Sequence, residues 1–410
     1  MGFRSYPEGF LWGSGTSAHQ VEGGNRYNDW WVFEQEGHVR DGEVSGDACE
    51  EWTRYASDYE IAAELGQNAH KLSVEWSRIE REPGVFDEEA LAHYEDVLRT
   101  LRGLGIKPFV VLHHFTNPLW LAATGGWEDP DAPRRFAEFA KVVAERFGGL
   151  AEAWITINEP MLFAAFGYFI GYWPPQRSSW RAGLRVARHL MLAHRLAYRA
   201  IKEVLPDATV GAAVNTTVFE LSPRQALWER LLVGPFDWFG NLWFLDRVRG
   251  ELDFVGLQYY SRTSVRSLVF GDPSAGPLGE SLPVTDVGWA IYPEGLHKVV
   301  RRTWHRYRLP IYITENGLAD HADVIRKVFI RDHLRCLLDA IEEGADVRGY
   351  FHWSLIDNFE WREGLRPRFG LIEVDYATQK RTVRDSARYY ERICWSNGIE
   401  VPEPPSSSDG

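Results

Sequence analysis

The sequence predicts a single-domain (β/α)8 barrel, the TIM-barrel architecture of the α/β class, over residues 1–398. Short apolar runs alternate with amphipathic segments along the whole chain, there are eight such runs, and no shift in composition marks a domain boundary. This alternation is typical of parallel strands joined by crossover helices, and eight units close most naturally into a barrel. The Pro- and Ser-rich residues 399–410 are expected to form a mobile C-terminal tail.

The expected strands are short runs rich in apolar residues. They lie near residues 10–18, 69–76, 107–114, 153–159, 209–216, 253–260, 310–315 and 348–354. Between them, apolar residues recur every three or four positions, which places them on one face of a helix. Examples, in chain order, are Leu91, Tyr94, Leu98 and Leu101, then Phe136, Phe139, Val143 and Phe147, then Ile325, Phe329, Cys336, Leu337 and Ile341.

Composition excludes several classes of protein. The chain has 410 residues and a formal net charge of -13, which disfavours a nucleic-acid partner because phosphate binding needs clustered Lys and Arg. Cys49, Cys336 and Cys394 are too few and too far apart for a disulfide framework or a zinc site, so we expect no metal and no cofactor. The sequence shows no apolar leader and no run long enough to cross a bilayer, so it predicts a cytoplasmic protein without a membrane partner.

Two glutamates at strand ends suggest the chemistry. Active sites of such barrels are assembled at the carboxyl ends of the strands, where Glu159 and Glu315 are expected. Glycoside hydrolysis needs two carboxyl groups, one to protonate the leaving oxygen and one to meet the developing oxocarbenium ion. Pro160 should hold Glu159 in an extended backbone, and Gly317 should let the chain turn after the second glutamate. One strand ending in Glu is commonplace, but two in one barrel favour this interpretation.

Other polar and aromatic residues are predicted at the same edge of the barrel. Unpartnered polar groups would be costly inside the barrel, whereas at its mouth they can face a polar ligand. The chain has 18 Trp, which is compatible with flat surfaces that stack on sugar rings, although most of these rings are expected in the core. Besides the two glutamates, the expected strand-end residues are Gln20, Arg78, His113, Asn158, Tyr260 and Trp353.

Five segments resemble, in the same order, signatures of glycoside hydrolase family 1, the β-glucosidase and β-galactosidase family. They are FLWGSGTSAHQVEG at 10–23, EWSRI at 75–79, TINEP at 156–160, ITENG at 313–317 and WSLIDNFEW at 353–361. The resemblance extends from about Phe10 to about Tyr390. It implies a retaining β-glycosidase that acts on small β-glycosides or short oligosaccharides by double displacement, with β-glucosides, β-galactosides and β-fucosides as expected substrates.

The resemblance also implies roles for individual residues. Glu159 would be the acid/base and Glu315 the nucleophile, with Arg78 as a fixed cation beside the nucleophile and Tyr260 as its hydrogen-bond donor. A structural ion pair of Arg78 elsewhere and a buried structural Tyr260 stay open as alternatives. The residues implied in binding the non-reducing sugar, with Asn158 at its 2-hydroxyl and Trp353 as the stacking floor, are Gln20, His113, Asn158, Trp353, Glu360, Trp361 and Phe369. His114 would only pack and bond to backbone.

Three departures from the family pattern limit what can be carried over. Gln258 replaces the usual Asn before Tyr259, which puts that amide's contact toward the acid in doubt, although the longer side chain could still reach. The stretch 206–253 is short for the family, so the leaving-group side is expected to be more open. Phe115 stands where many members have Trp, which should alter the rim more than the chemistry.

Three other activities are alternatives to this interpretation. A 6-phospho-β-glycosidase is disfavoured because Glu360 would repel a phosphate, but Arg366 and Arg368 in the same loop leave it open. A thioglucosidase of the myrosinase type lacks the acid glutamate, and Glu159 argues against it. A non-catalytic carbohydrate-binding barrel would not need both carboxylates. The preferred sugar, the natural aglycone and the oligomeric state are left undetermined by the sequence.

Overall fold

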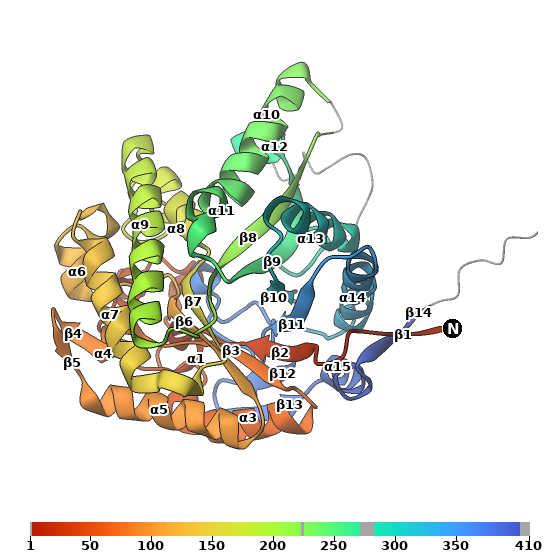
Figure 1. Cartoon of the computed structure of the whole chain (residues 1–410), viewed down its shortest axis with the longest axis horizontal. Helices are drawn as coiled ribbons and strands as arrows, with labels where there is room; N and C mark the ends of the chain where they lie inside the picture. Colours follow the sequence, from red (N-terminus) through yellow and green to blue (C-terminus); the bar gives the residue numbers. More distant parts are fainter. Residues whose placement is uncertain (1, 223–224, 271–282, 402–410) are drawn as a thin grey trace, which may run out of the picture.

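The computed structural model describes residues 2–222, 225–270 and 283–401, and within these ranges eight parallel strands close into a barrel (Figure 1). All eight expected strands are confirmed, with boundaries that differ by a few residues. In the order of their neighbours around the barrel they are β2 (Leu11–Gly15), β3 (Ala69–Ser73), β6 (Lys107–His113), β7 (Ala153–Asn158), β8 (Val210–Glu220), β9 (Phe254–Ser264), β10 (Ile311–Gly317) and β11 (Val347–Trp353).

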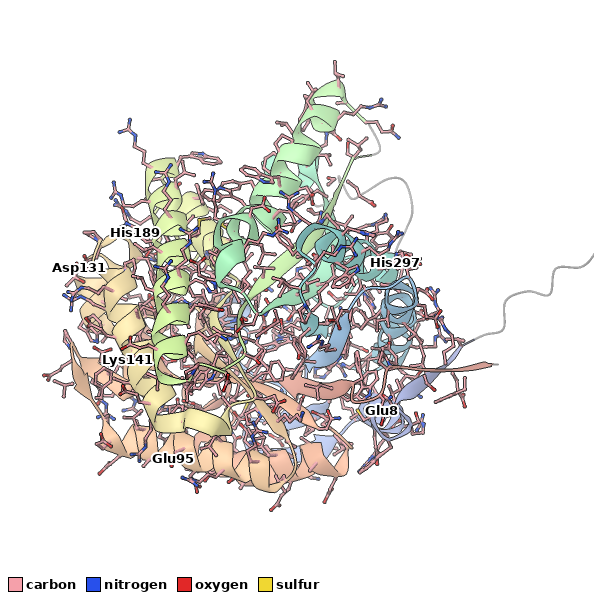
Figure 2. All side chains as sticks on the ribbon, viewed as in Figure 1. Glu8, Glu95, Asp131, Lys141, His189 and His297 are labelled. Carbon is pink, nitrogen blue, oxygen red and sulfur yellow. The ribbon has the colours of Figure 1, made fainter. Side chains whose placement is uncertain are left out.

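Long helices cover the outside of the barrel. They are α3 (Glu51–Glu64), α5 (Glu88–Gly103), α7 (Ala132–Phe147), α9 (Trp180–Val204), α13 (Pro293–Tyr307), α14 (Arg326–Glu342) and α15 (Asp385–Ser396). The predicted apolar face of α5 is buried, and Asp87 caps this helix by accepting hydrogen bonds from Glu89 N and Ala90 N. Charged side chains such as Glu95 and Lys141 project from the opposite faces toward solvent (Figure 2).

Shorter helices occupy the loops between these elements. They are α1 (Ala18–Val21), α2 (Asp29–Gln35), α4 (Trp76–Ile79), α6 (Leu119–Ala123), α8 (Pro160–Ala164), α10 (Leu227–Asp237), α11 (Trp243–Val248) and α12 (Val265–Phe270). Among them, α1, α4 and α8 directly follow β2, β3 and β7, so they shape the loops at the carboxyl ends of those strands.

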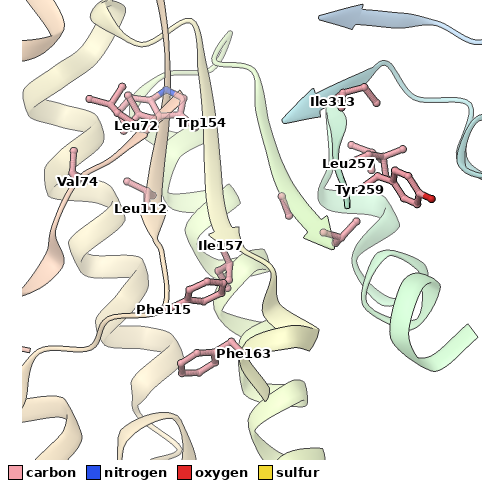
Figure 3. Close-up of a cluster of buried hydrophobic side chains, with 14 of the residues drawn as sticks. Leu72, Val74, Leu112, Phe115, Trp154, Ile157, Phe163, Leu257, Tyr259 and Ile313 are labelled. Carbon is pink, nitrogen blue, oxygen red and sulfur yellow. The ribbon is translucent and has the colours of Figure 1, made fainter. Parts of the chain in front are cut away.

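The hydrophobic core has two layers because successive strand residues point to opposite faces. Inside the barrel, Phe109, Phe254, Phe351 and the partly buried Tyr312 pack together, with ring centroids 4.8 to 6.3 Å apart. Between the strands and the helices lies the larger layer, part of which Figure 3 shows with Leu72, Ile157, Leu257 and Ile313 labelled. The bottom of the barrel is therefore filled by aromatic and aliphatic side chains.

Three small antiparallel sheets lie outside the barrel and were not predicted. They pair β1 (Gly2–Ser5) with β14 (Gly398–Val401), β4 (Glu80–Glu82) with β5 (Val85–Phe86), and β12 (Ile372–Asp375) with β13 (Lys380–Val383). The expectation of a tail from residue 399 was wrong for residues 399–401, because Ile399 and Val401 are buried where β14 pairs with β1. The remainder of that expected tail, residues 402–410, lies outside the described residues.

Strands β8 and β9 are each 11 residues long and pair as far as Glu220 and Ser264. They continue beyond the barrel and carry α10 and α12, which project from the body of the molecule (Figure 1). Leu227 and Leu231 on α10 are 74% and 68% exposed. The segment expected to be short, 206–253, contains all of β8, together with α10 and α11, and ends just before β9.

Candidate active site

Glu159 lies immediately after β7 and is 4% exposed. Its backbone N–H donates to Ala213 O at 2.8 Å, and its Oε1 accepts from Asn215 Nδ2 at 2.8 Å. The expected extended backbone was wrong, because Glu159 is left-handed with φ 49° and ψ 54°. The strand ends one residue earlier, and Pro160 serves as the first residue of α8, a position where its missing N–H is not needed. A left-handed non-glycine residue is strained and is often found at functional sites.

Glu315 lies on β10 and accepts hydrogen bonds from three donors on two other strands, β3 and β9. Its Oε1 accepts from Lys71 Nζ and from Gln258 Nε2, the latter at 2.7 Å, and its Oε2 accepts from Tyr260 OH at 2.5 Å. Gln258 is its register partner on β9, and Lys71 reaches it from β3 with a fully buried side chain. A buried carboxylate with three donors is held in one orientation.

The two glutamates interact electrostatically. Burial is the main cause that raises the pKa of Glu159, and the nearby charge of Glu315 raises it further. The Asn215 hydrogen bond and the charge of Lys71 act in the opposite direction. The arrangement therefore separates the two carboxyl groups chemically, because Glu159 is biased to keep a proton while Glu315 has a cation and two neutral donors.

The expected placement of Arg78 beside Glu315 was wrong. Arg78 donates from Nε to Glu22 Oε2 at 2.9 Å and from Nη2 to Gly23 O, and its guanidinium stacks on Trp52 at 4.1 Å. Arg78 lies in α4, the short helix after β3, and this helix carries its side chain away from the strand axis. The cation that contacts Glu315 is Lys71, within β3 itself. Lys71 was not predicted, although a charged residue in the middle of a buried strand is a signal that could have identified it.

The two neighbouring histidines have the reverse of their expected positions. His113 bonds to Asn117 Oδ1 at 3.0 Å and packs edge-on against Trp127 and Phe163, outside the barrel. His114 instead faces the site, with Nε2 3.3 Å from Asn158 Nδ2. Alternation from the inward-facing Phe109 and Val111 would turn His113 inward, but it faces outward like its β7 partner Ile157. Burial and the charge of Lys71 lower the pKa of His114 well below its usual value, so this ring is neutral.

A second group of polar residues comes from the loop after β11. Gln20 Nε2 donates to Phe359 O at 2.9 Å and to Glu360 Oε2 at 3.2 Å, while its Oε1 accepts from Ser17. Glu360 retains some exposed surface, yet burial first and then the charge of Glu315 raise its pKa to about 8. Gln20 and Glu360 therefore lie together, on the Glu315 side of the site.

Aromatic rings frame these polar groups. Trp353 ends β11, with Lys71 Nζ 5.6 Å from its ring centroid, and the His114 ring lies between Trp353 and Trp361 at 6.0 and 5.9 Å. Phe115 packs on Trp361 at 5.1 Å, so the substitution noted in the sequence lies in the wall behind that tryptophan. A sugar ring has apolar faces and polar hydroxyls at its edge. Flat aromatic faces can stack on the former, and neighbouring hydrogen-bonding groups can bind the latter.

A further aromatic cluster lies beside the donor of Glu315. Phe369 is buried near Tyr260 at 6.5 Å, and both lie against Trp289, whose ring centroid is 5.5 Å from Tyr260 and 6.0 Å from Phe369. Trp289 is 38% exposed and was not predicted. Burial, followed by the charge of Glu315, raises the pKa of Tyr260 well above its usual value, so the phenol keeps its proton and donates it.

Sequence reasoning therefore missed four residues that the structure brings to the site: Lys71, His114, Asn215 and Trp289. Gln258 was noted as a departure, and it contacts Glu315 and Asn158, whereas the contact to Glu159 comes from Asn215. Asn215, Gln258 and Glu315 occupy one row across β8, β9 and β10. Within the described ranges there is no group of His, Cys, Asp or Glu residues that could hold a metal ion.

Comparisons with known proteins agree with this geometry. The sequence profile of Glycosyl hydrolase family 1 matches residues 3–248 and 244–399. "Beta-glucosidase A" of Thermotoga maritima is 33% identical over 98% of this chain and 100% of its own length, and "Beta-galactosidase" of Pyrococcus woesei is 32% identical over 96% and 98%. A solved structure of the Thermotoga maritima beta-glucosidase in complex with glucoimidazole has a TM-score of 0.90 and 31% identity, covering 96% of this chain and 100% of that one.

Two buried carboxyl groups at the mouth of a (β/α)8 barrel, one with a raised pKa and one held by three donors, are the kind of pair that glycoside hydrolysis requires. The profile and the full-length relatives place the chain more narrowly, because it belongs to glycosyl hydrolase family 1, a family of retaining β-glycosidases. The predicted family and class of enzyme are thereby confirmed. The profile match divides at residues 244–248, inside the segment that the sequence marks as short for the family.

Proposed function

We propose that this chain hydrolyses terminal, non-reducing β-D-glycosyl residues of small β-glycosides or short oligosaccharides, with Glu315 as nucleophile and Glu159 as acid/base. The observation that carries the proposal is the asymmetry of the two carboxyl groups. Glu315 accepts from Lys71, Gln258 and Tyr260, whereas burial and the charge of Glu315 raise the pKa of Glu159. Names of relatives such as beta-glucosidase and beta-galactosidase support this substrate class.

In the first step, a carboxylate oxygen of Glu315 attacks the anomeric carbon while Glu159 gives its proton to the glycosidic oxygen, so the aglycone leaves as an alcohol. A glycosyl ester on Glu315 is formed with inverted configuration. Tyr260, Gln258 and Lys71 hold the attacking group in place, so little reorganisation is needed at the moment of reaction.

In the second step, the negative charge of Glu315 is absent because the carboxylate has become an ester. The charge that helped to raise the pKa of Glu159 is then lost, and Glu159, now deprotonated, can take a proton from water. The resulting hydroxide equivalent attacks the anomeric carbon and releases Glu315. A second inversion restores the β configuration, so the overall reaction retains it.

Sugar recognition would come from the residues around the catalytic pair. Asn158 Nδ2, His114 and the Gln20–Glu360 pair offer hydrogen-bonding groups, and Trp353 offers an apolar face. Two buried polar atoms at the site, His114 Nδ1 and Gln258 Oε1, have no hydrogen-bond partner among the described residues, which favours a polar ligand there. A 6-phospho sugar is disfavoured, because Arg368 contacts Asp357 Oδ2 and Val374 O and stacks on Tyr376 instead of facing Glu360.

The test is chemical rescue of the nucleophile. Glu315→Gly should abolish turnover of 2,4-dinitrophenyl β-glucoside, because no carboxylate remains to attack the anomeric carbon. Added azide can occupy the vacated space and should restore release of the phenol, with an α-glucosyl azide as the product. A Glu315→Gly enzyme that is active without azide, or a rescued product of β configuration, would show that the nucleophile is another residue. Glu363→Gly, in the loop after β11, is the control and should respond to no added anion.

A further inference from the structure

The side-chain oxygen of Asn158 is fully occupied by donors from two strands. Asn158 Oδ1 accepts from Lys71 Nζ at 2.8 Å and from Gln258 Nε2 at 2.7 Å. An amide oxygen has two lone pairs, so no acceptor capacity remains on this atom. Asn158, Gln258 and the Lys71 side chain are all fully buried, so water cannot substitute for either donor.

These contacts select one of the two orientations of the Asn158 amide. Rotating the amide by 180° would place its NH2 group against the ammonium of Lys71 and the NH2 of Gln258, leaving buried donors facing donors. In the observed orientation Nδ2 points away from Lys71 and lies 3.3 Å from His114 Nε2. One N–H of Asn158 can therefore serve the neutral His114 ring, and the other is left for a ligand.

The same two donors also bind Glu315 Oε1, at 2.7 Å in the case of Gln258. Lys71 and Gln258 thus form a bridge between the nucleophile position and the Asn158 amide. Tyr260 donates to Glu315 Oε2, and no contact of Tyr260 with Asn158 is among the hydrogen bonds of the described residues. This difference between Gln258 and Tyr260 makes the two roles of the bridge separable by experiment.

We propose that Gln258, together with Lys71, is a positioning residue that holds the Asn158 amide with Nδ2 toward the substrate, so that hydrolysis depends on the sugar's 2-hydroxyl. The inference rests on the proposed function, because it presumes that a glycosyl ring occupies the site beside Glu315. A hydrogen bond to the 2-hydroxyl strengthens in the transition state of glycoside hydrolysis. A donor of fixed direction is favourable for that contact, whereas a rotatable amide would present N–H or C=O indiscriminately.

The experiment compares 4-nitrophenyl β-glucoside with 4-nitrophenyl 2-deoxy-β-glucoside. For each enzyme, the ratio of the two kcat/KM values measures the dependence on the 2-hydroxyl, and the intrinsic difference in reactivity cancels when ratios are compared between variants. Gln258→Met keeps the length of the side chain and removes its donors. We expect it to lower the ratio about tenfold, as is ordinary for losing one oriented hydrogen bond. Tyr260→Phe is the matched control, because it removes a donor from Glu315 alone, and it should slow both substrates equally.

A cycle with Asn158→Ala identifies the residue through which Gln258 acts. In the Asn158→Ala background, Gln258→Met should no longer change the ratio. Gln258→Glu offers a second variant of similar shape if the Met variant does not fold, and it should lower the ratio because an acceptor now faces Asn158 Oδ1. The inference is overturned if Gln258→Met or Gln258→Glu leaves the ratio unchanged while slowing both substrates, or if Tyr260→Phe lowers the ratio equally. If the unmodified enzyme turned over neither substrate, that result would instead contradict the proposed function.

Discussion

At the scale of single residues, the two oxygens of the Glu315 carboxylate accept hydrogen bonds from different donors. Tyr260 holds one oxygen, while Lys71 and Gln258 share the other. Lysine is a compact point charge, so it can contact Glu315 and Asn158 at once from within β3. Glu159 accepts from the neutral donor Asn215 and has a raised pKa. The two glutamates are therefore chemically different although their residue type is the same.

Removing the proton donor should matter in proportion to how much help the leaving group needs. Glu159→Ala should slow hydrolysis of cellobiose far more than formation of the glycosyl ester from 2,4-dinitrophenyl β-glucoside, since that phenol departs without protonation. Steady-state rates on cellobiose and pre-steady-state phenol bursts on the aryl glycoside provide the comparison. Equal losses on both substrates would argue that Glu159 is not the acid.

Residue type and motif order were enough to predict most of the site, but not the direction of each side chain. Glu159, Glu315, Tyr260, Asn158 and Trp353 lie where strand ends were expected. His113 was misplaced because it departs from the alternation of Phe109 and Val111 at the end of β6, and Arg78 was misplaced because it lies in α4, the short helix that follows β3. The β7–β8 pairing shifts register between Ile155 and Asn158, and the β10–β9 pairing shifts between Ile313 and Glu315. Period-two alternation does not reveal such shifts.

At the scale of elements, β10 and β11 pair beside the site, where Gly317 lies opposite Trp353. Gly317 was expected to allow a turn, but it is the last residue of β10, and a Cβ there would clash with Trp353 O. The absence of a side chain therefore permits the strand contact that places Glu315 near Trp353. Gly317 is important for the site, as the sequence indicated, but the physical reason is close packing against β11 and not backbone freedom.

Gly317→Ala should accordingly destabilise the fold and impair the site. Overpacking against a neighbouring strand costs roughly 1–3 kcal/mol, and displacement of β10 should lower kcat because Glu315 lies two residues away. Urea unfolding and assays with an aryl β-glucoside measure the two effects. Gly103→Ala, at the end of α5 where an added Cβ meets open space, is the matched control and should be neutral or slightly stabilising. If both variants behaved alike, the close-contact explanation would be wrong.

The order of strands and helices was predictable because hydrophobic periodicity is a local property of the sequence. The small sheets were not, because β1 and β14 pair residues from opposite ends of the chain, Gly2 with Val401 for example. Likewise, nothing local distinguishes the ends of β8 and β9 inside the barrel from the parts that extend beyond it. The two strands pair with each other as far as Glu220 and Ser264, and this pairing depends on the helices α10 and α12 that they carry.

At the scale of the whole molecule, the buried carboxyl groups link stability to pH. Burial raises the pKa of Glu360 to about 8, whereas in the unfolded chain it would titrate near the ordinary value of about 4.3. Between these values the native state binds more protons than the unfolded state. The stabilising contribution of this carboxyl group is therefore full below the lower value and is lost as the pH rises to the upper one.

Glu360→Gln removes this titration without changing the shape of the side chain. The variant should lose less unfolding free energy than the unmodified protein between pH 5 and pH 8, because the Gln amide does not need to release a proton. Urea unfolding curves at the two pH values provide the measurement. An identical pH dependence in the two proteins would mean that Glu360 is ionised in the folded state throughout this range.

The proposed mechanism requires that Glu315 form the covalent bond to the sugar. A 2-deoxy-2-fluoro-β-glucoside with a dinitrophenyl leaving group slows both steps, while the good leaving group lets the first proceed, so the glycosyl ester accumulates. Peptide mass spectrometry of the inactivated protein should then find one fluoroglucosyl group, attached to Glu315. A label on Glu159, Glu360 or any other residue, or phenol release without a label, would contradict the assignment of the nucleophile and the division of roles built on it.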